Sequence, residues 1–434
     1  MQTVAGMSDS LSKPRILVIT EDNGFLRGLR VDMPLINLKK RGLIDSYYVT
    51  DPTLFDVPDE YFFDVVWLQR VRNSKLIAHL GQVIDNNYLY DLDDFMIGMP
   101  SYIPEQELRN KEVIVRAIRN CKVLTVTSAR LTRLLESAVE PGLCEKTVVC
   151  PNGFEFPKAT RPPLKPQGIV LTQSDRLALT TSLSTVMTAV INFSERHDLP
   201  IYFFGSLEKE ITSWSSRIIH VGRLAFWHYH AVLAALPSMV GIAPLETAGD
   251  KDTLDFINGK SDVKMVGYGG MGHPSVYSDT PPYSDTDLKV GILVENTFDA
   301  WTHGLETVYH DMWRKLDFDQ EQVVELRNMD RVASEFWYDA ILKARLSFRM
   351  TGRDIKFSSG RTGFYVGALR HMVFSQDHAF RRQLRENMPP LLVRTLRKFV
   401  MKGRKMPSTG VLCHMTGFFT IYSVWLRIDQ TQGV

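Results

Sequence analysis

The sequence predicts an α/β protein with two consecutive domains, each built on a parallel sheet with crossover helices, followed by a basic extension. Short apolar runs rich in β-branched and aromatic residues recur along the chain, with helical stretches between them. A proline-rich segment at 154–168 interrupts this alternation, which then restarts, as expected of a linker between domains. The length of 434 residues is enough for about two or three domains.

The predicted strands fall into two series. Those of the first domain are 16–19, 47–49, 64–68, 88–90, 123–126 and 148–150, and those of the second are 169–171, 201–204, 218–221, 240–243 and 290–294. The predicted boundaries are 1–155 for the first domain, 156–335 for the second and 336–434 for the extension. A helix at 334–349 follows the second domain. Two such domains enclose a cleft at the carboxyl ends of their strands, where α/β folds bind ligands.

The net charge of +2 is a cancellation between two unlike parts. Residues 341–434 contain 17 Lys and Arg against 4 Asp and Glu, so this tail carries +13 and the remainder −11. Within the tail, 389–405 predicts an amphipathic helix with a basic face, and 411–426 adds an aromatic, apolar run. Such a segment suits an anionic membrane surface; a core-packing helix with a solvated basic face is the alternative. A tail of this kind carries no recognised nucleic-acid motif, so we expect no nucleic-acid partner.

Composition excludes several classes of protein. With 44% hydrophobic and 23% charged residues, the chain is neither disordered nor fibrous. The four cysteines have no metal-ligand spacing, so we interpret them as free cytosolic thiols. The polar residues 1–15 do not resemble a secretory signal, and no apolar window is long enough to span a bilayer. We therefore expect a cytoplasmic protein, peripheral on the inner face of the cell membrane.

The segment 241–283 is the most informative. It predicts a strand, an acidic loop, a helix that opens at Lys260-Ser261-Asp262, and a glycine-rich turn into a strand at 274–278. A helix start offers free backbone N–H groups and a positive dipole end, and Lys260 and Lys264 add positive charge one turn apart. The pattern predicts a seat for a pyrophosphate, although Ser-Asp openings also cap many ordinary helices.

Several motifs together resemble GT-B glycosyltransferases of the retaining, glycogen-synthase-like superfamily, in its bacterial surface-polysaccharide branch. The resemblance covers roughly residues 15–335. Its motifs follow in the family's order: Gly24 to Arg30 with Pro34 and Leu35, Leu68-Gln69-Arg70-Val71, Tyr90-Asp91-Leu92-Asp93-Asp94, Cys150-Pro151-Asn152-Gly153, Pro244-Leu245-Glu246, Phe256 to Ser261 with Lys264, Tyr268 to Pro274, and Pro282-Tyr283.

The resemblance implies a role for each of these regions. Glu246 faces the hydroxyls of the donor sugar; Lys260, Ser261 and Lys264 bind its diphosphate; and the loop with Gly24, Arg27 and Arg30 faces the cleft. Arginine also suits bidentate phosphate binding, with surface charge at a helix start as the alternative. The family has a second glutamate that holds the nucleotide ribose, and here Gly267 occupies its position.

Asp93 and Asp94 follow a predicted strand, and we place them as catalytic-site residues near the acceptor, with a helix N-cap role as the alternative. The run Asp91-Leu92-Asp93 has the spacing of a metal-binding acidic motif. In a GT-B site, however, basic side chains and a helix end bind the phosphates, so the resemblance implies no metal and no cofactor beyond the nucleotide diphosphate sugar.

The sequence thus predicts a metal-independent, hexosyltransferase-like enzyme that retains anomeric configuration and moves a sugar to a glycan or lipid-linked acceptor in surface polysaccharide biosynthesis. Because of Gly267, a catalytically inactive GT-B binding or scaffold subunit of a polysaccharide assembly complex is the alternative. A nucleotide-sugar epimerase is a further candidate, but it has no evident need for the basic tail.

Overall fold

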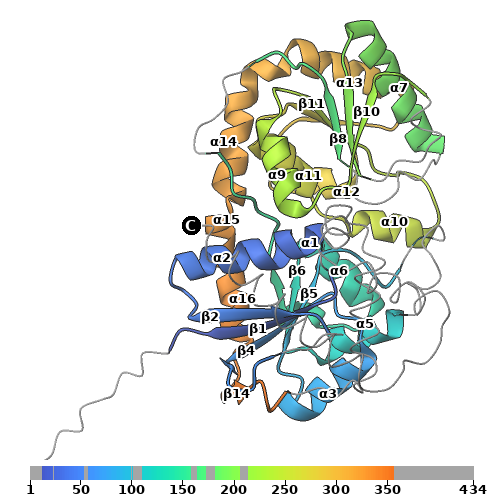
Figure 1. Cartoon of the computed structure of the whole chain (residues 1–434). Helices are drawn as coiled ribbons and strands as arrows, with labels where there is room; N and C mark the ends of the chain where they lie inside the picture. Colours follow the sequence, from blue (N-terminus) through green and yellow to red (C-terminus); the bar gives the residue numbers. More distant parts are fainter. Residues whose placement is uncertain are drawn as a thin grey trace, which may run out of the picture. The chain divides into compact units, whose positions relative to one another are not determined.

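Two six-stranded parallel sheets form the framework of the protein in a computed structural model (Figure 1). The structure describes residues 12–22, 24–52, 57–98, 100, 110–157, 164–172, 181–205 and 214–355. A compact unit, Met1–Phe357, contains both sheets. The predicted tail helix 389–405 and the aromatic run 411–426 lie outside the described residues. No helix among those described combines the length and apolarity needed to cross a membrane.

The first sheet has the strand order β2-β1-β4-β5-β6-β7, with every neighbouring pair parallel. The strands are β1 (Arg15–Thr20), β2 (Ser46–Thr50), β4 (Val65–Gln69), β5 (Leu89–Leu92), β6 (Val123–Val126) and β7 (Thr147–Val149). One face carries η1 (Gly28–Asp32) and α2 (Met33–Lys40), and the other carries α3 (Ser74–Ile84), α5 (Lys111–Asn120) and α6 (Ala129–Ala138). With both faces covered, the inner strands are buried and mostly apolar, which accounts for the hydrophobic runs in the sequence. Gln69, Asp91 and Thr125 are among their buried polar residues.

The second sheet has the order β10-β9-β8-β11-β12-β13, again all parallel. Its strands are β8 (Ile169–Thr172), β9 (Ile201–Phe204), β10 (Ile218–Gly222), β11 (Val240–Ala243), β12 (Ser275–Ser278) and β13 (Ile292–Val294). The helices α7 (Thr181–His197) and α13 (Phe298–His310) lie side by side on one face (Figure 1). The helices α9 (Phe226–Ala235) and α11 (Val263–Gly270) cover the other face. This doubly wound order confirms the predicted pair of Rossmann-like domains.

Local sequence explains where several helices begin. Asn73, Ser128, Asp250 and Thr297 each accept a hydrogen bond from a backbone N–H one turn into the helix that follows. The predicted glycine-rich turn is different, because Gly267, Gly269 and Gly270 lie inside α11 rather than after it. A Cβ on Gly269 would lie 2.8 Å from Val323 and one on Gly270 would lie 2.0 Å from the ring of Phe156, so these two glycines allow close packing. Gly272, with a φ of 73°, lies in the turn after the helix.

The segment after the second domain returns to the first. From α14 (Leu316–Arg327) the chain runs through α15 (Met329–Val332), η4 (Ala333–Trp337) and α16 (Tyr338–Lys343). Trp337 stacks on Trp67 of β4 at 4.5 Å between ring centroids, and β14 (Met350–Thr351) pairs with β3 (Phe62–Phe63). The described part of the predicted extension, 336–355, therefore packs against the amino-terminal domain.

Candidate functional site

The site is built where the order of the second sheet reverses. The neighbours β8 and β11 are separated in sequence by β9 and β10, and α/β folds bind ligands at the carboxyl ends of such a strand pair. Tyr268 of α11 closes the base of this region. Its hydroxyl accepts a hydrogen bond from the backbone N–H of Thr172 at 2.9 Å and donates to the carbonyl of Ile242 at 3.2 Å. These bonds fix α11 to the ends of both strands.

Glu246 lies in the loop after β11, which ends at Ala243, and is 5% exposed. Its Oε1 accepts hydrogen bonds from the backbone N–H groups of Thr247 and Ala248, both at 2.9 Å, and from the hydroxyl of Ser182 at 2.6 Å. The loop itself is held because the carbonyl of Leu245 accepts a bond from Asn296 at 2.7 Å. The carboxylate is therefore fixed in orientation at the carboxyl edge of the second sheet.

Lys260, Ser261 and Lys264 lie at the start of α11. Because α11 runs back toward the amino end of β12, its first turn lies at the carboxyl edge of the sheet, the edge that also carries Glu246. Burial and the nearby charge of Lys260 lower the pKa of Lys264 to about 7. The Nζ of Lys260 lies 4.2 Å from the centroid of the Phe256 ring. Two cationic groups and the N–H groups of a helix start thus share one edge, as an anion site requires.

The residue before α11 has a supporting role. The buried carboxylate of Asp262 accepts hydrogen bonds from Arg327 at 3.2 Å and from the hydroxyl of Thr286 at 2.7 Å. Arg327 ends α14, the helix that leads back to the first domain. This pairing balances the negative charge of Asp262, which would otherwise oppose an anion at the helix start.

Arg30 does not occupy the donor position predicted for it. It is 1% exposed, its Nη2 lies 2.6 Å from Asp91 Oδ1, and its guanidinium stacks on Trp337 at 4.6 Å. Its Nη1 donates to Asn152 Oδ1 at 3.1 Å, and Asn152 in turn donates to the Ser261 hydroxyl oxygen at 2.9 Å. The prediction of direct phosphate contact fails because burial and protein acceptors engage the whole guanidinium. The same hydrogen bonds connect the first sheet to the predicted phosphate loop.

Arg27 and Gly24 lie in α1 (Phe25–Arg27) and just before it. The Nε of Arg27 lies 3.2 Å from Asp32, and the N–H of Gly24 donates to Asp22 at 2.7 Å. Both residues are at least partly exposed, and these bonds join them to residues in or near the same loop. Their donor contacts stay a prediction.

Asp93 and Asp94 directly follow β5, and both pair with Arg70. The separations are 2.5 Å from Arg70 Nε to Asp93 and 2.9 Å from Arg70 Nη2 to Asp94. Arg70 itself has a φ of 53°, a left-handed conformation that is uncommon for a residue with a side chain. Burial raises the pKa of Asp93 to about 6 although the charge of Arg70 opposes the shift. Neither carboxylate caps a described helix, and Asp91 and Asp93 each face an arginine.

Arg130 is a site residue that sequence analysis missed. It lies in the first turn of α6 in the amino-terminal domain and is 8% exposed. Its guanidinium donates to backbone carbonyls of the other domain: Asn258 at 2.5 Å, Lys260 at 2.8 Å and Pro281 at 2.6 Å. These bonds hold the backbone on either side of the predicted phosphate loop. Its Nη1 also lies 3.6 Å from the Asp285 carboxylate. No motif could reveal it, because its partners are mostly main-chain atoms and lie more than a hundred residues away.

Two glycines allow the domains to approach closely. A Cβ on Gly28 would lie 2.4 Å from the ring of Phe226, and a Cβ on Gly259 would lie 2.4 Å from Cβ of Phe95. Phe25 also packs edge-on against Phe226 at 5.2 Å between ring centroids. The start of the first domain therefore contacts α9, and the loop before Lys260 contacts the segment after Asp94.

Comparisons with known proteins identify the fold. No protein-family model matches the chain, and no curated protein matches its sequence. Among solved structures, Anabaena HepE in complex with UDP and glucose aligns with a TM-score of 0.51 and 12% identity, over 74% of this chain and 97% of HepE. AviGT4, a glycosyltransferase involved in avilamycin A biosynthesis, aligns over 78% of this chain and all of its own, with 12% identity and a TM-score of 0.48. The likeness to HepE confirms the predicted GT-B glycosyltransferase-like fold.

Proposed function

We propose that this GT-B protein is a glycosyltransferase that moves a sugar from a nucleoside diphosphate donor to a glycan or lipid-linked acceptor in surface polysaccharide biosynthesis. One observation carries the proposal. A fixed carboxylate, Glu246, and the cationic start of α11 lie at the same edge of the second sheet, next to the point where the strand order reverses. A sugar diphosphate needs both: an acceptor for sugar hydroxyls and positive charge for its phosphates.

The chemistry requires stabilisation of the leaving diphosphate as the glycosidic bond breaks. In our proposal Lys260, Lys264 and the first N–H groups of α11 meet that developing negative charge, so basic groups replace a metal ion. Glu246 orients the donor sugar. The acceptor hydroxyl attacks from the same face and passes its proton to the departing phosphate, which retains the anomeric configuration. Asp93 and Asp94 line the acceptor side.

Supporting residues act at a distance from the reacting atoms. Arg30 and Asn152 position the Ser261 hydroxyl, and Arg130 positions the backbone at Lys260. Closure of the two domains about the linker 154–168 excludes water and so limits hydrolysis of the donor.

A catalytically inactive scaffold subunit is the alternative, and Gly267 favours it. A Cβ at this position would meet only Leu233 at 3.7 Å and the Tyr229 hydroxyl at 3.9 Å, so the fold does not require glycine there. The position has room for a Cβ, and the chain lacks the glutamate that binds ribose in the family it resembles. Loss of one such charged contact costs about 1 to 3 kcal/mol of binding.

A screen of nucleotide sugars tests the proposed function. Thermal unfolding would be followed with UDP-, GDP- and dTDP-sugars, with UDP-glucose first because HepE was solved with UDP and glucose. CMP-sugars, which carry one phosphate, are the matched control. A ligand at about 100 times its Kd stabilises the protein by about 2.7 kcal/mol. Release of nucleotide or transfer of sugar supports an enzyme; stabilisation without turnover in the presence of acceptor extracts supports the scaffold.

The pKa of Lys264 predicts how donor binding depends on pH. A sugar diphosphate has no proton to lose near neutral pH, so the change comes from the protein. With a pKa of about 7, Lys264 is charged at pH 6 and mostly neutral at pH 8. If the donor binds only when Lys264 is charged, its affinity falls about tenfold from pH 6 to pH 8. Calorimetry should then detect a proton taken up on binding. Lys264→Arg, which stays charged, should remove the dependence. An unchanged pH slope in that variant would contradict the assignment.

The basic tail is proposed, from its sequence alone, to bind an anionic membrane surface beside the acceptor. Each basic side chain near such a surface contributes about 1 kcal/mol. Deletion of residues 389–434 should therefore weaken sedimentation with phosphatidylserine vesicles and leave phosphatidylcholine vesicles unaffected. Equal binding of phosphatidylserine vesicles by the full chain and the truncated chain would contradict this proposal and favour a packing role for the tail.

A further inference from the structure

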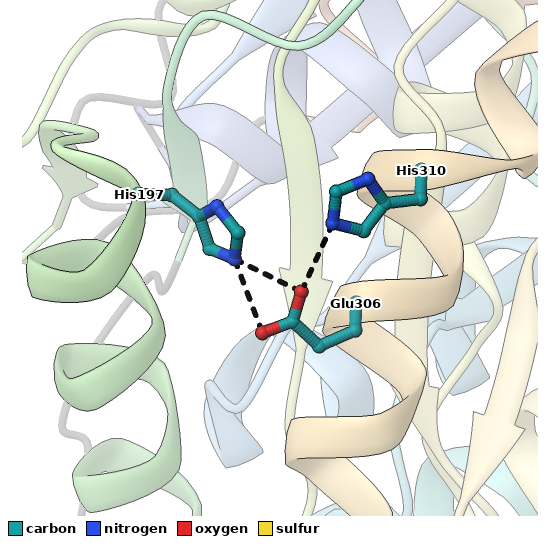
Figure 2. Close-up of side chains that lie close together, drawn as sticks. All are labelled: His197, Glu306 and His310. Atoms are coloured by element: carbon teal, nitrogen blue, oxygen red, sulfur yellow. Dashed lines mark hydrogen bonds and ion pairs between the residues drawn. The ribbon is translucent and has the colours of Figure 1, made fainter.

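A second group of chemically active side chains lies away from the donor site, on α7 and α13 (Figure 2). His197 is the last residue of α7, and Glu306 and His310 are one turn apart at the end of α13. Both helices follow strands and run back across the sheet, so their carboxyl ends lie at the amino edge of the second sheet. Glu246 and the start of α11 lie at the opposite edge.

Three potential ligand atoms converge in this group. Glu306 Oε2 lies 2.9 Å from His197 Nε2 and 3.3 Å from His310 Nε2, and the ligand atoms all lie within 4.8 Å of one another. A tetrahedral Zn²⁺ with bonds of about 2.0–2.2 Å places its ligand atoms about 3.3–3.6 Å apart. The separation of 3.3 Å between Glu306 and His310 matches this geometry, and the 2.9 Å between Glu306 and His197 would have to lengthen.

The surroundings hold two of the three ligands in orientation. The ring of His197 packs against Phe193 and Tyr309, each at 4.6 Å between centroids. The other carboxylate oxygen of Glu306, Oε1, accepts a hydrogen bond from Arg196 at 2.6 Å. A carboxylate held in this way presents Oε2 to both imidazoles. Residues that do not bind a metal themselves commonly orient its ligands by such hydrogen bonds.

The types of ligand atom decide which ion fits. Ca²⁺ and Mg²⁺ need several oxygen ligands and would meet one carboxylate here. Two imidazoles and one carboxylate are a ligand set for Zn²⁺.

We propose that His197, Glu306 and His310 bind one Zn²⁺, with water in the fourth position, and that the ion links the carboxyl ends of α7 and α13. The site does not depend on the proposed sugar transfer. The competing explanation is a plain network of His–Glu and Arg–Glu ion pairs, which the same distances also allow without an ion.

Calorimetric titration of ZnCl₂ into the chelator-treated full chain distinguishes the two. We expect one equivalent to bind and to raise the unfolding temperature, and we expect added acid to weaken binding, because a histidine must be deprotonated to bind Zn²⁺. His310→Ala should weaken binding by more than about tenfold and remove the thermal shift. His310 is 54% exposed, so this variant should fold. The matched control is His303→Ala, an exposed histidine on the same helix and outside the group.

Three results would overturn the proposal: no stoichiometric Zn²⁺ binding by the full chain, equal binding by His310→Ala, or equal competition by MgCl₂. Glu306→Gln is a second variant that keeps the shape of the ligand and removes its charge. It should also weaken Zn²⁺ binding. If Glu306→Gln binds Zn²⁺ as tightly as the full chain and His303→Ala binds it less tightly, the ion is bound elsewhere and the assignment is wrong.

Discussion

Replacing Lys260 with alanine is expected to lower the rate of sugar transfer by about 10²- to 10³-fold, the usual effect of removing one group that stabilises charge in a transition state. Lys260 precedes α11, where the leaving diphosphate would accumulate negative charge. Its backbone carbonyl, held by Arg130, is unchanged by the substitution. The loss should appear in kcat more than in donor affinity, because the charge develops as the bond breaks.

The control for this variant is Lys251→Ala, which removes a lysine whose side chain is 84% exposed at the start of α10 (Lys251–Asn258). It should leave transfer unchanged. The contact of Lys260 with Phe256 contributes about 0.5–1 kcal/mol to stability. The unfolding temperature of both variants should therefore be measured together with the transfer rate, to separate a loss of stability from a loss of catalysis. Unaltered transfer by Lys260→Ala would remove the start of α11 from the proposed phosphate site.

Replacing Glu246 with glutamine is expected to lower kcat/KM by about ten- to a hundredfold, because a hydrogen bond to a charged group contributes about 1.5–3 kcal/mol. Glutamine keeps the length of the side chain and an oxygen that can accept from Thr247 and Ala248. The fold should therefore survive while the charge that faces the donor sugar is lost. Glu335→Gln, an exposed carboxylate on η4, is the matched control.

A deoxy analogue of the donor sharpens this test. If Glu246 binds a sugar hydroxyl, the enzyme discriminates against a donor that lacks this hydroxyl, and Glu246→Gln loses most of the discrimination. If Glu246→Gln lowers kcat/KM by the same factor for the donor and for the deoxy analogue, Glu246 has only a structural role in its loop. Non-additivity between the two changes is the signature of direct contact.

The return of the chain to the first domain illustrates what could not be predicted. The sequence predicts the helix at 334–349, but its periodicity does not show that Trp337 stacks on Trp67. A sequence pattern shows which side of a helix or strand is apolar. It does not show which other apolar surface that side packs against. The predicted extension therefore began at 336, whereas described residues as far as 355 pack with the first domain.

Arg30 and Arg130 show the same limit in the site. Both are arginines near a helix start, and only Arg30 belongs to a recognised motif. The structure buries Arg30 against Asp91 and directs Arg130 to carbonyls of the other domain. A sequence cannot separate a phosphate-binding arginine from one that binds protein carbonyls, because the side-chain chemistry is the same and only the partner differs.

The sequence by itself determined the two α/β domains, most of their strands, the start of α11 and the residues Glu246, Lys260 and Lys264 at one sheet edge. These depend on local periodicity, capping and the rule that parallel strands end at a common edge. Only the tertiary structure decided which arginines support the site, where 336–355 packs, and that His197 meets Glu306 and His310. Such contacts join segments far apart in the chain, and the packing of whole helices and sheets, which no local pattern encodes, brings them together.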